Sequence, residues 1–180
     1  MDMREKQLSH QYFFEGKIMK TRLDEVLLPN GRMARREVCE HVGGVGVLPI
    51  DENGNVVLVR QYRYPYGEVI YEIPAGKMDH GPENAELCGR RELKEETGFT
   101  AGRMIPLGAI YPSPGFLTEV VHLYAALGLT PGECAPDEDE FVEHVTVPFA
   151  ELERMIAADE IRDGKTVVAA YRARLKGLAK

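Results

Sequence analysis

The stretch from Gly76 to Phe99 constrains this chain most, because it joins a glycine turn to a segment dense in carboxylates. Glu92, Glu95 and Glu96 have the spacing i, i+3 and i+4, which places them on one face of a helix. Clustered carboxylates repel one another unless a cation lies between them. A hard divalent ion with oxygen ligands, Mg²⁺ or Mn²⁺, suits such a site.

A solvated helix face is the simpler interpretation, since Glu- and Lys-rich helices are common and their exposed ion pairs are weak. The neighbouring residues favour a metal site instead. Tyr71 to Gly76 indicate a short apolar strand that ends in a Pro/Gly turn, and Gly98 is expected to end the helix at its C′ position. Phe99 is then expected to fold back onto the core. A strand, a glycine loop and an acidic helix together are typical of a functional site.

The same stretch resembles the Nudix box, the signature G-x5-E-x7-R-E-U-x-E-E-x-G-U, in which U is a bulky apolar residue. The positions that fit with the correct spacing are Glu83, Arg91, Glu92, Leu93, Glu95, Glu96, Gly98 and Phe99. The chain departs from the signature once, because six residues instead of five separate Gly76 from Glu83. The extra residue falls in the loop of residues 79–82, where an insertion is tolerated better than inside a helix.

The resemblance implies hydrolysis of a nucleoside diphosphate linked to another moiety, with Mg²⁺ (or Mn²⁺) as cofactor. The expected metal ligands are the carboxylates of Glu92, Glu95 and Glu96 and the backbone carbonyl of Ala75. Structural roles are implied for Gly76, Glu83, Arg91 and Gly98. Arg91 would pair with a neighbouring glutamate and hold its rotamer. Glu83 would either complete the metal shell or interact with the helix dipole.

The general base is expected in the acidic loop of residues 137–140, because metal occupies the helix carboxylates. In related enzymes a glutamate from a mobile loop at this point of the chain activates the water. Glu138 and Glu140 are both candidates, beside Glu96 as a catalytic metal ligand, and the sequence does not choose between the two loop residues. A merely solvated acidic turn is the alternative.

Substrate preference is expected to depend on residues outside the box. Pro114 follows Gly98 by 16 residues, in a YPSPGF setting that resembles the ADP-ribose pyrophosphatases. Four other segments resemble that subfamily: residues 28–31 with Arg36-Glu37, residues 60–63, residues 72–77 and residues 137–143. The candidate substrate-binding residues are Arg36, Arg60, Arg63, Pro114, Gly115 and Phe116.

The resemblance thus implies that ADP-ribose and water give AMP and ribose 5-phosphate. The guanidinium of Arg63 is a candidate to bind phosphate or ribose oxygens. The alternative is that Arg60 and Arg63 are solvated charges at the end of a strand. Tyr12 or Phe14 is a candidate for stacking on the adenine. Hydrolysis of another nucleotide sugar, such as GDP-mannose, is the alternative within the enzyme class. A non-catalytic nucleotide-sugar sensor is a third hypothesis, which the intact acidic helix disfavours.

The expected fold is α/β (α+β), a Nudix-type α/β/α sandwich with a mixed sheet and a small N-terminal antiparallel β unit. Residues 1–41 are assigned to that unit, with 1–8 frayed, and residues 42–180 to the catalytic domain. Residues 42–62 are predicted to form a hairpin around a turn at 51–55. Val167, Val168, Tyr171, Leu175 and Leu178 are predicted to form the buried face of a last helix.

An N-terminal unit of this size is too small to fold alone and must pack on a partner. In the subfamily such a unit commonly builds a homodimer and lends residues to the neighbour's site, Arg36 being the candidate here.

Composition indicates which classes of binding partner and which cellular location to expect. A net charge of −7 over 180 residues argues against nucleic-acid binding, but bound cations permit a polyanionic small substrate. Three widely spaced cysteines form neither a disulfide framework nor a zinc site. The N-terminus has no apolar signal segment, and no run of about 18 apolar residues occurs. A cytoplasmic protein without membrane contact is therefore expected.

Overall fold

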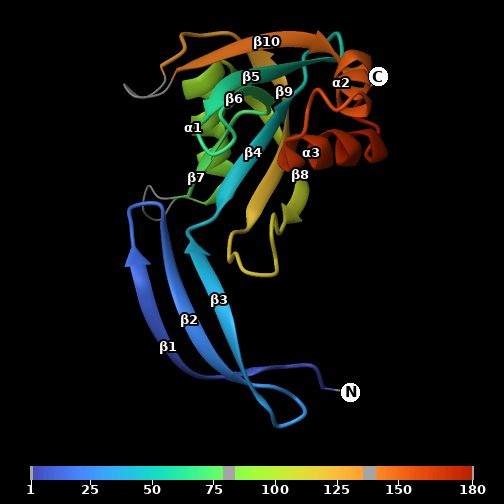
Figure 1. The fold of residues 1–180 in the computed structure, drawn as a ribbon. Helices are drawn as coiled ribbons and strands as arrows, with labels where there is room; N and C mark the ends of the chain where they lie inside the picture. The colour runs from blue at the N-terminus through green and yellow to red at the C-terminus, as the bar shows by residue number, and fades with distance from the viewer. Residues whose placement is uncertain (1, 79–83, 136–140, 180) are drawn as a thin grey trace. The chain divides into compact units, whose positions relative to one another are not determined.

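The computed structural model describes residues 2–78, 84–135 and 141–179 (Figure 1). The chain divides into two compact units. One consists of Met1–Gly43 and Tyr111–Val120, and the other of Gly44–Ile110 and Val121–Lys180. A segment between two strands of the second unit therefore belongs to the first.

The first unit contains a three-stranded antiparallel sheet with the strand order β1-β2-β3. Its strands are β1 (Lys6–Glu15), β2 (Met19–Leu27) and β3 (Met33–His41). Because β1 begins at Lys6, the expectation that residues 1–8 are frayed was wrong for its last three residues. The segment Tyr111–Val120 is held to β3 by two backbone bonds, from Cys39 N to Phe116 O (2.7 Å) and from Thr118 N to Cys39 O (2.9 Å).

The second unit contains two sheets. The mixed sheet has the order β7-β4-β9-β8, in which β4 and β9 are parallel. Its strands are β4 (Gly44–Pro49), β7 (Ala75–Lys77), β8 (Thr100–Ile110) and β9 (Val121–Thr130). The other sheet is antiparallel, with the order β10-β5-β6. Its strands are β5 (Asn55–Arg63), β6 (Glu68–Glu72) and β10 (Val142–Pro148).

The predicted hairpin over residues 42–62 was wrong. The turn itself forms, since Asp51 Oδ1 accepts hydrogen bonds from the backbone N–H groups of Asn53 (2.9 Å) and Asn55 (2.8 Å). Beyond a single bridge between Ile50 and Val56, however, β4 and β5 separate into different sheets. A turn signal specifies a local reversal, whereas strand pairing depends on which partner completes the core.

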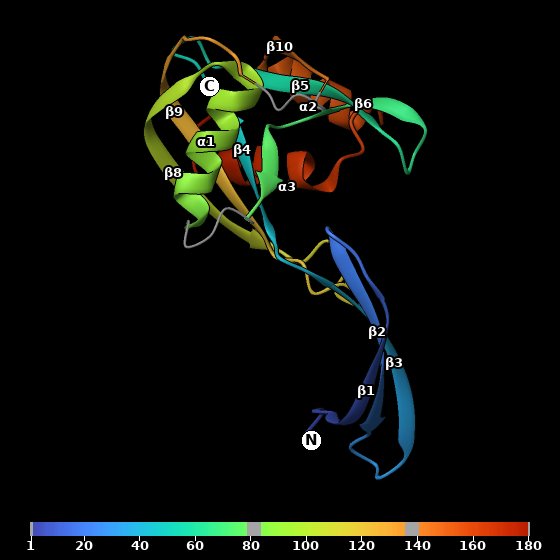
Figure 2. The same ribbon diagram turned by 90° about the vertical axis from the view of Figure 1, so that its left-hand side faces the viewer.

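Helices cover both faces of the mixed sheet (Figures 1 and 2). Helix α1 (Ala85–Thr97) packs Cys88 and Leu93 against Val45 and Val47 of β4. Helices α2 (Phe149–Ala157) and α3 (Gly164–Leu175) pack on the larger core cluster that contains Leu48. The predicted α/β/α sandwich with a mixed sheet is confirmed. Across the described residues, no helix combines the length and apolarity that a membrane crossing requires.

The predicted buried face of α3 was wrong in part. Val167, Val168 and Leu178 are half-buried and pack against the core cluster, as predicted. Tyr171 and Leu175 are 65% and 68% exposed, whereas Ala169, Ala170 and Ala173 are buried. Alanines let the helix approach the sheet closely, so small side chains occupy the fully buried part of the contact, while Tyr171 and Leu175 point outward. The pattern of bulky apolar residues therefore indicated a helix correctly but misplaced its buried stripe.

Candidate active site

Helix α1 has a local signal at each end. Asn84 is its N-cap, and the Asn84 side-chain oxygen accepts a hydrogen bond from the backbone N–H of Leu87 at 2.9 Å. Gly98 ends the helix with φ +74°, a conformation that favours glycine, and its N–H bonds to Lys94 O at 2.8 Å. Phe99 then packs against the core cluster beneath the helix.

Glycine also sets the distance between α1 and the sheet. A Cβ added at Gly89 would lie 3.0 Å from a methyl group of Val47 and 3.1 Å from one of Val45. The helix therefore lies almost directly on β4, which brings its carboxylate face beside the neighbouring strand β7.

Two glutamates of this face contact the backbone of β7. Glu96, only 3% exposed, accepts a hydrogen bond from the backbone N–H of Ala75 at 3.0 Å. Glu92, 7% exposed, lies so close to Gly76 that a Cβ there would overlap its carboxylate. Gly76 thus permits a close approach of the β7 backbone and the Glu92 carboxylate.

Arg91 contacts the carboxylates of both Glu92 and Glu95. Its Nη1 lies 2.7 Å from Glu92 Oε1 and 2.8 Å from Glu95 Oε2, so one cationic nitrogen contacts both side chains. Within residues 2–78, 84–135 and 141–179, no three or more His, Cys, Asp or Glu side chains converge as a preformed metal site. The oxygen donors nevertheless fit a hard divalent cation, because Glu92 and Glu95 already share one positive charge in this structure.

Arg63 lies in the same unit and forms a forked ion pair with Glu72. Its Nε is 2.5 Å from Glu72 Oε1, and its Nη2 is 3.0 Å from Glu72 Oε2. Burial lowers the pKa of Arg63, but the Glu72 hydrogen bond and nearby carboxylates, including Glu96, outweigh it and raise that pKa. The guanidinium of Arg63 is therefore close enough to the acidic helix to interact with it electrostatically.

Arg60 has different surroundings. It lies 3.1 Å from Glu143, which is 76% exposed, and its guanidinium stacks 5.5 Å from the ring centre of Tyr71. These contacts are typical of a surface cation on a sheet. Arg60 and Arg63 are thus not brought together, because residues i and i+3 of a strand point to opposite faces.

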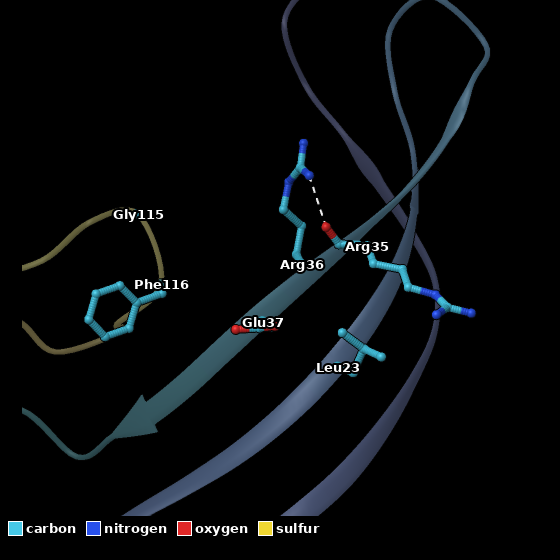
Figure 3. Close-up of a pocket in the computed structure, with 6 residues that line it drawn as sticks. All are labelled: Leu23, Arg35, Arg36, Glu37, Gly115 and Phe116. Carbon is cyan, nitrogen blue, oxygen red and sulfur yellow. Dashed lines mark hydrogen bonds between the residues drawn. The ribbon is translucent and has the colours of Figure 1, made fainter.

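A pocket of about 470 Å³ lies in the first unit, between β2, β3 and the Tyr111–Val120 segment. Its lining residues are Leu23, Arg35, Arg36, Glu37, Gly115 and Phe116 (Figure 3). The pocket therefore brings together three candidate substrate-binding residues. Arg36 forms a forked pair with Glu5, at 2.9 and 2.6 Å, and bonds to the carbonyl of Arg35. Pro114 precedes this lining and is not part of it.

The two adenine-stacking candidates differ in their surroundings. The Tyr12 hydroxyl donates to Glu40 at 3.0 Å, whereas Phe14 is 54% exposed. Three other sequence candidates, Glu83, Glu138 and Glu140, lie outside the described residues.

Sequence reasoning missed four polar residues that a chain of contacts links to Arg63, namely Glu72, Lys165, Asp163 and Thr166. Glu72 is 1% exposed, and it contacts Lys165, which precedes the fully buried Thr166. A charged residue in a predicted apolar strand was the available signal for Glu72. An Asp at position 163 with Thr166 three residues later was the signal for the helix cap.

Comparison with known proteins identifies the family. A family model described as "NUDIX domain" matches residues 40–170. The chain belongs to the NUDIX family. Nudix hydrolases generally use divalent metal ions, in agreement with the oxygen donors on α1.

Individual Nudix relatives cover nearly the whole chain. An ADP-ribose pyrophosphatase of Bacillus subtilis (strain 168) is 38% identical, covering 97% of this chain and 95% of the relative. A methanol dehydrogenase activator of Bacillus methanolicus is 41% identical, covering 92% and 90%. A GDP-mannose pyrophosphatase of Yersinia enterocolitica is 36% identical, covering 81% and 80%. A solved structure titled an ADP compounds hydrolase has the same fold, with a TM-score of 0.86 at 22% identity and coverage of 99% and 98%.

Proposed function

We propose that this Nudix protein is a hydrolase that cleaves the diphosphate of ADP-ribose to AMP and ribose 5-phosphate. The supporting observation is the contact of the Glu92 and Glu96 carboxylates with the Ala75–Gly76 backbone. The similarity to an ADP-ribose pyrophosphatase over 97% of the chain supports the choice of substrate.

The proposed cofactor is Mg²⁺, with Mn²⁺ as a substitute, held by Glu92, Glu95, Glu96 and the carbonyl of Ala75. A bound divalent cation neutralises diphosphate oxygens and lowers the pKa of water. Loading requires at least one of the carboxylates of Glu92 and Glu95 to release Arg91, which both contact in this structure. Arg91 then holds the rotamer of whichever carboxylate stays paired with it.

The remaining roles belong to proton transfer and substrate binding. Glu138 or Glu140 would accept the proton of the attacking water. Arg63 would bind phosphate or ribose oxygens through the guanidinium N–H groups that its fork with Glu72 does not use. Arg60, Pro114, Gly115 and Phe116 are proposed to contribute to substrate binding as well.

We further propose a cytoplasmic homodimer in which residues 1–41 form the contact and Arg36 serves the partner's site. The sheet β1-β2-β3 and the turn between β1 and β2 expose several large apolar side chains, which suits a protein contact. They are Leu8, Phe13, Phe14, Ile18, Met19 and Met33, each 42–65% exposed. Light scattering on a sizing column tests this, and a monomer at micromolar concentration contradicts it.

Substrate competition tests the function. The purified protein is assayed with Mg²⁺ against ADP-ribose, GDP-mannose, NADH and diadenosine polyphosphates. ADP-ribose is expected among the best substrates. A clear preference for GDP-mannose would move the protein to the alternative substrate class, and nucleotide-sugar binding without turnover would make it a sensor.

Glutamine variants of the acidic helix test the metal ligands. Glu95→Gln and Glu96→Gln are expected to lower kcat by at least about a hundredfold, because each removes a charged metal ligand while keeping the side-chain shape. Circular dichroism confirms the fold, and Glu86→Gln on the same helix is the control, since Glu86 pairs only with Arg90 at the surface among the described contacts. Full turnover in both test variants would refute the metal assignment.

A further inference from the structure

Glu72 is a buried carboxylate held between two cations. Its side chain is 1% exposed and accepts two hydrogen bonds from Arg63 and one from Lys165, with Oε2 shared by both cations. Arg63, by contrast, is 37% exposed. The ion pair therefore has a buried anion and a partly exposed cation that can meet a ligand.

Lys165 is itself anchored. Its side chain is 15% exposed, and its ammonium lies 3.0 Å from Asp163 Oδ1. Asp163 caps α3 by accepting hydrogen bonds from the backbone N–H and the hydroxyl of Thr166, at 3.0 and 2.5 Å. A side chain of Lys is long and flexible, so two carboxylate contacts and near-burial are what restrict it to one position.

The same helix end also holds the strand connection that carries Glu72. Ile73 N donates to Thr166 Oγ1 at 2.8 Å in a fully buried contact, and two residues later Ala75 N donates to Glu96. The start of α3 thus fixes both the carboxylate of Glu72 and the backbone that runs from it to the acidic helix.

We infer that Lys165 is a positioning residue that holds Glu72 from the interior, so that Glu72 keeps the guanidinium of Arg63 oriented beside the acidic helix to receive the substrate diphosphate. This inference rests on the proposed function. Lys165 does not contact the substrate in this scheme. It acts through Glu72 alone, 93 residues away in the chain.

The charge balance explains the expected effect. Asp163, Lys165, Glu72 and Arg63 alternate in sign and sum to zero. Without the Lys165 ammonium, the buried carboxylate of Glu72 and the half-buried carboxylate of Asp163 share one cation, and Arg63 is drawn toward them and away from an anionic ligand. Binding is then weakened, while the carboxylates on α1 that carry out the reaction are unchanged.

Steady-state kinetics with ADP-ribose and Mg²⁺ test the inference. Lys165→Met is expected to raise KM about tenfold and to leave kcat within about twofold of the wild type. Lys165→Arg restores the charge and is expected to recover most of the loss. The control is Arg162→Met, which removes a positive charge three residues before Lys165. Arg162 forms an exposed ion pair with Glu68, in which the two side chains are 58% and 45% exposed. Its KM is expected to stay at the wild-type value.

A second measurement reports on Arg63 without any substrate. Its Nε–H resonance in ¹⁵N-correlated NMR spectra, assigned by its loss in Arg63→Lys, is expected to be sharp in the wild type. In Lys165→Met it is expected to shift and broaden. An unchanged Arg63 resonance overturns the inference, even if KM rises, because Lys165 would then act on the substrate directly.

The two readouts separate this inference from the proposed function. If the wild type fails to hydrolyse ADP-ribose while the Arg63 resonance responds to Lys165→Met, the function is wrong and the positioning stands. If the wild type is active and Lys165→Met changes neither KM nor the resonance, the positioning is wrong and the function stands. Should Lys165→Met not fold, Asp163→Asn keeps a helix-capping side chain, removes the second anchor of Lys165 and is judged by the same readouts.

Discussion

Replacing Gly76 with alanine should disrupt the proposed metal site on α1, although no residue of the helix itself is substituted. The new Cβ would overlap the carboxylate carbon and both oxygens of Glu92. Because this carboxylate is the end of a flexible side chain, we expect Glu92 to rotate away while the backbone of β7 stays in place.

The structure sets the size of the effect. Rotation separates Glu92 from Arg91, now 2.7 Å apart, and a lost hydrogen bond between charged groups costs about 1.5–3 kcal/mol. For a protein of this size each kcal/mol lowers Tm by about 2–4 °C. Removal of one carboxylate from the proposed metal site should reduce kcat by about a hundredfold or more.

Scanning calorimetry and the ADP-ribose assay with Mg²⁺ measure the two effects on the same preparation. Gly164→Ala is the matched control, because a Cβ at Gly164 meets nothing within 4 Å. It should leave Tm unchanged or raise it slightly through the entropy of the unfolded chain. A Gly76→Ala variant with wild-type Tm and wild-type turnover would refute the close contact between Gly76 and Glu92.

Three further expectations concern α3 and the ion pair beneath it. Thr166→Val should destabilise the protein by about 1–3 kcal/mol in urea unfolding, because the buried N–H of Ile73 loses its acceptor; an unchanged midpoint would contradict this. Leu175→Ala should change the free energy of unfolding by no more than about 0.5 kcal/mol, because Leu175 is exposed. Ala173→Leu should lower it by about 1–3 kcal/mol, because Ala173 is buried. A larger loss of stability from Leu175→Ala than from Ala173→Leu would contradict the observed orientation of α3. Burial raises the pKa of Glu72, but its bonds to two cations outweigh this and lower the pKa below 4.5. Its ion pair should therefore be fully stabilising above about pH 4.5 and weaken as the pH falls through the lowered pKa, so a plot of Tm against pH should be steeper there for the wild type than for Glu72→Gln.

Local physics accounts for what the sequence revealed about α1. The 3.6-residue period alone places Glu92, Glu95 and Glu96 together, and a glycine at position 98 ends the helix wherever that helix packs. The family resemblance rests on the same residues, and the NUDIX domain match to residues 40–170 agrees with it.

Long-range packing accounts for what the sequence did not reveal. The turn at Asp51 forms as predicted, but β4 pairs in parallel with β9, more than 70 positions further along the chain, and β5 pairs with β10. No residue in a strand specifies its partner, because backbone hydrogen bonds are alike for all partners and only burial of the completed core distinguishes them.

The sequence by itself determined the acidic helix, its two ends and the chemistry that three clustered carboxylates suit. Only the tertiary structure decided that Gly76 lies against Glu92, that alanines form the buried face of α3, and that Lys165 contacts Glu72. The physical reason is the range of the interactions. Helix periodicity and caps act over a few residues, whereas the environment of a buried charge depends on side chains that only the completed fold brings together.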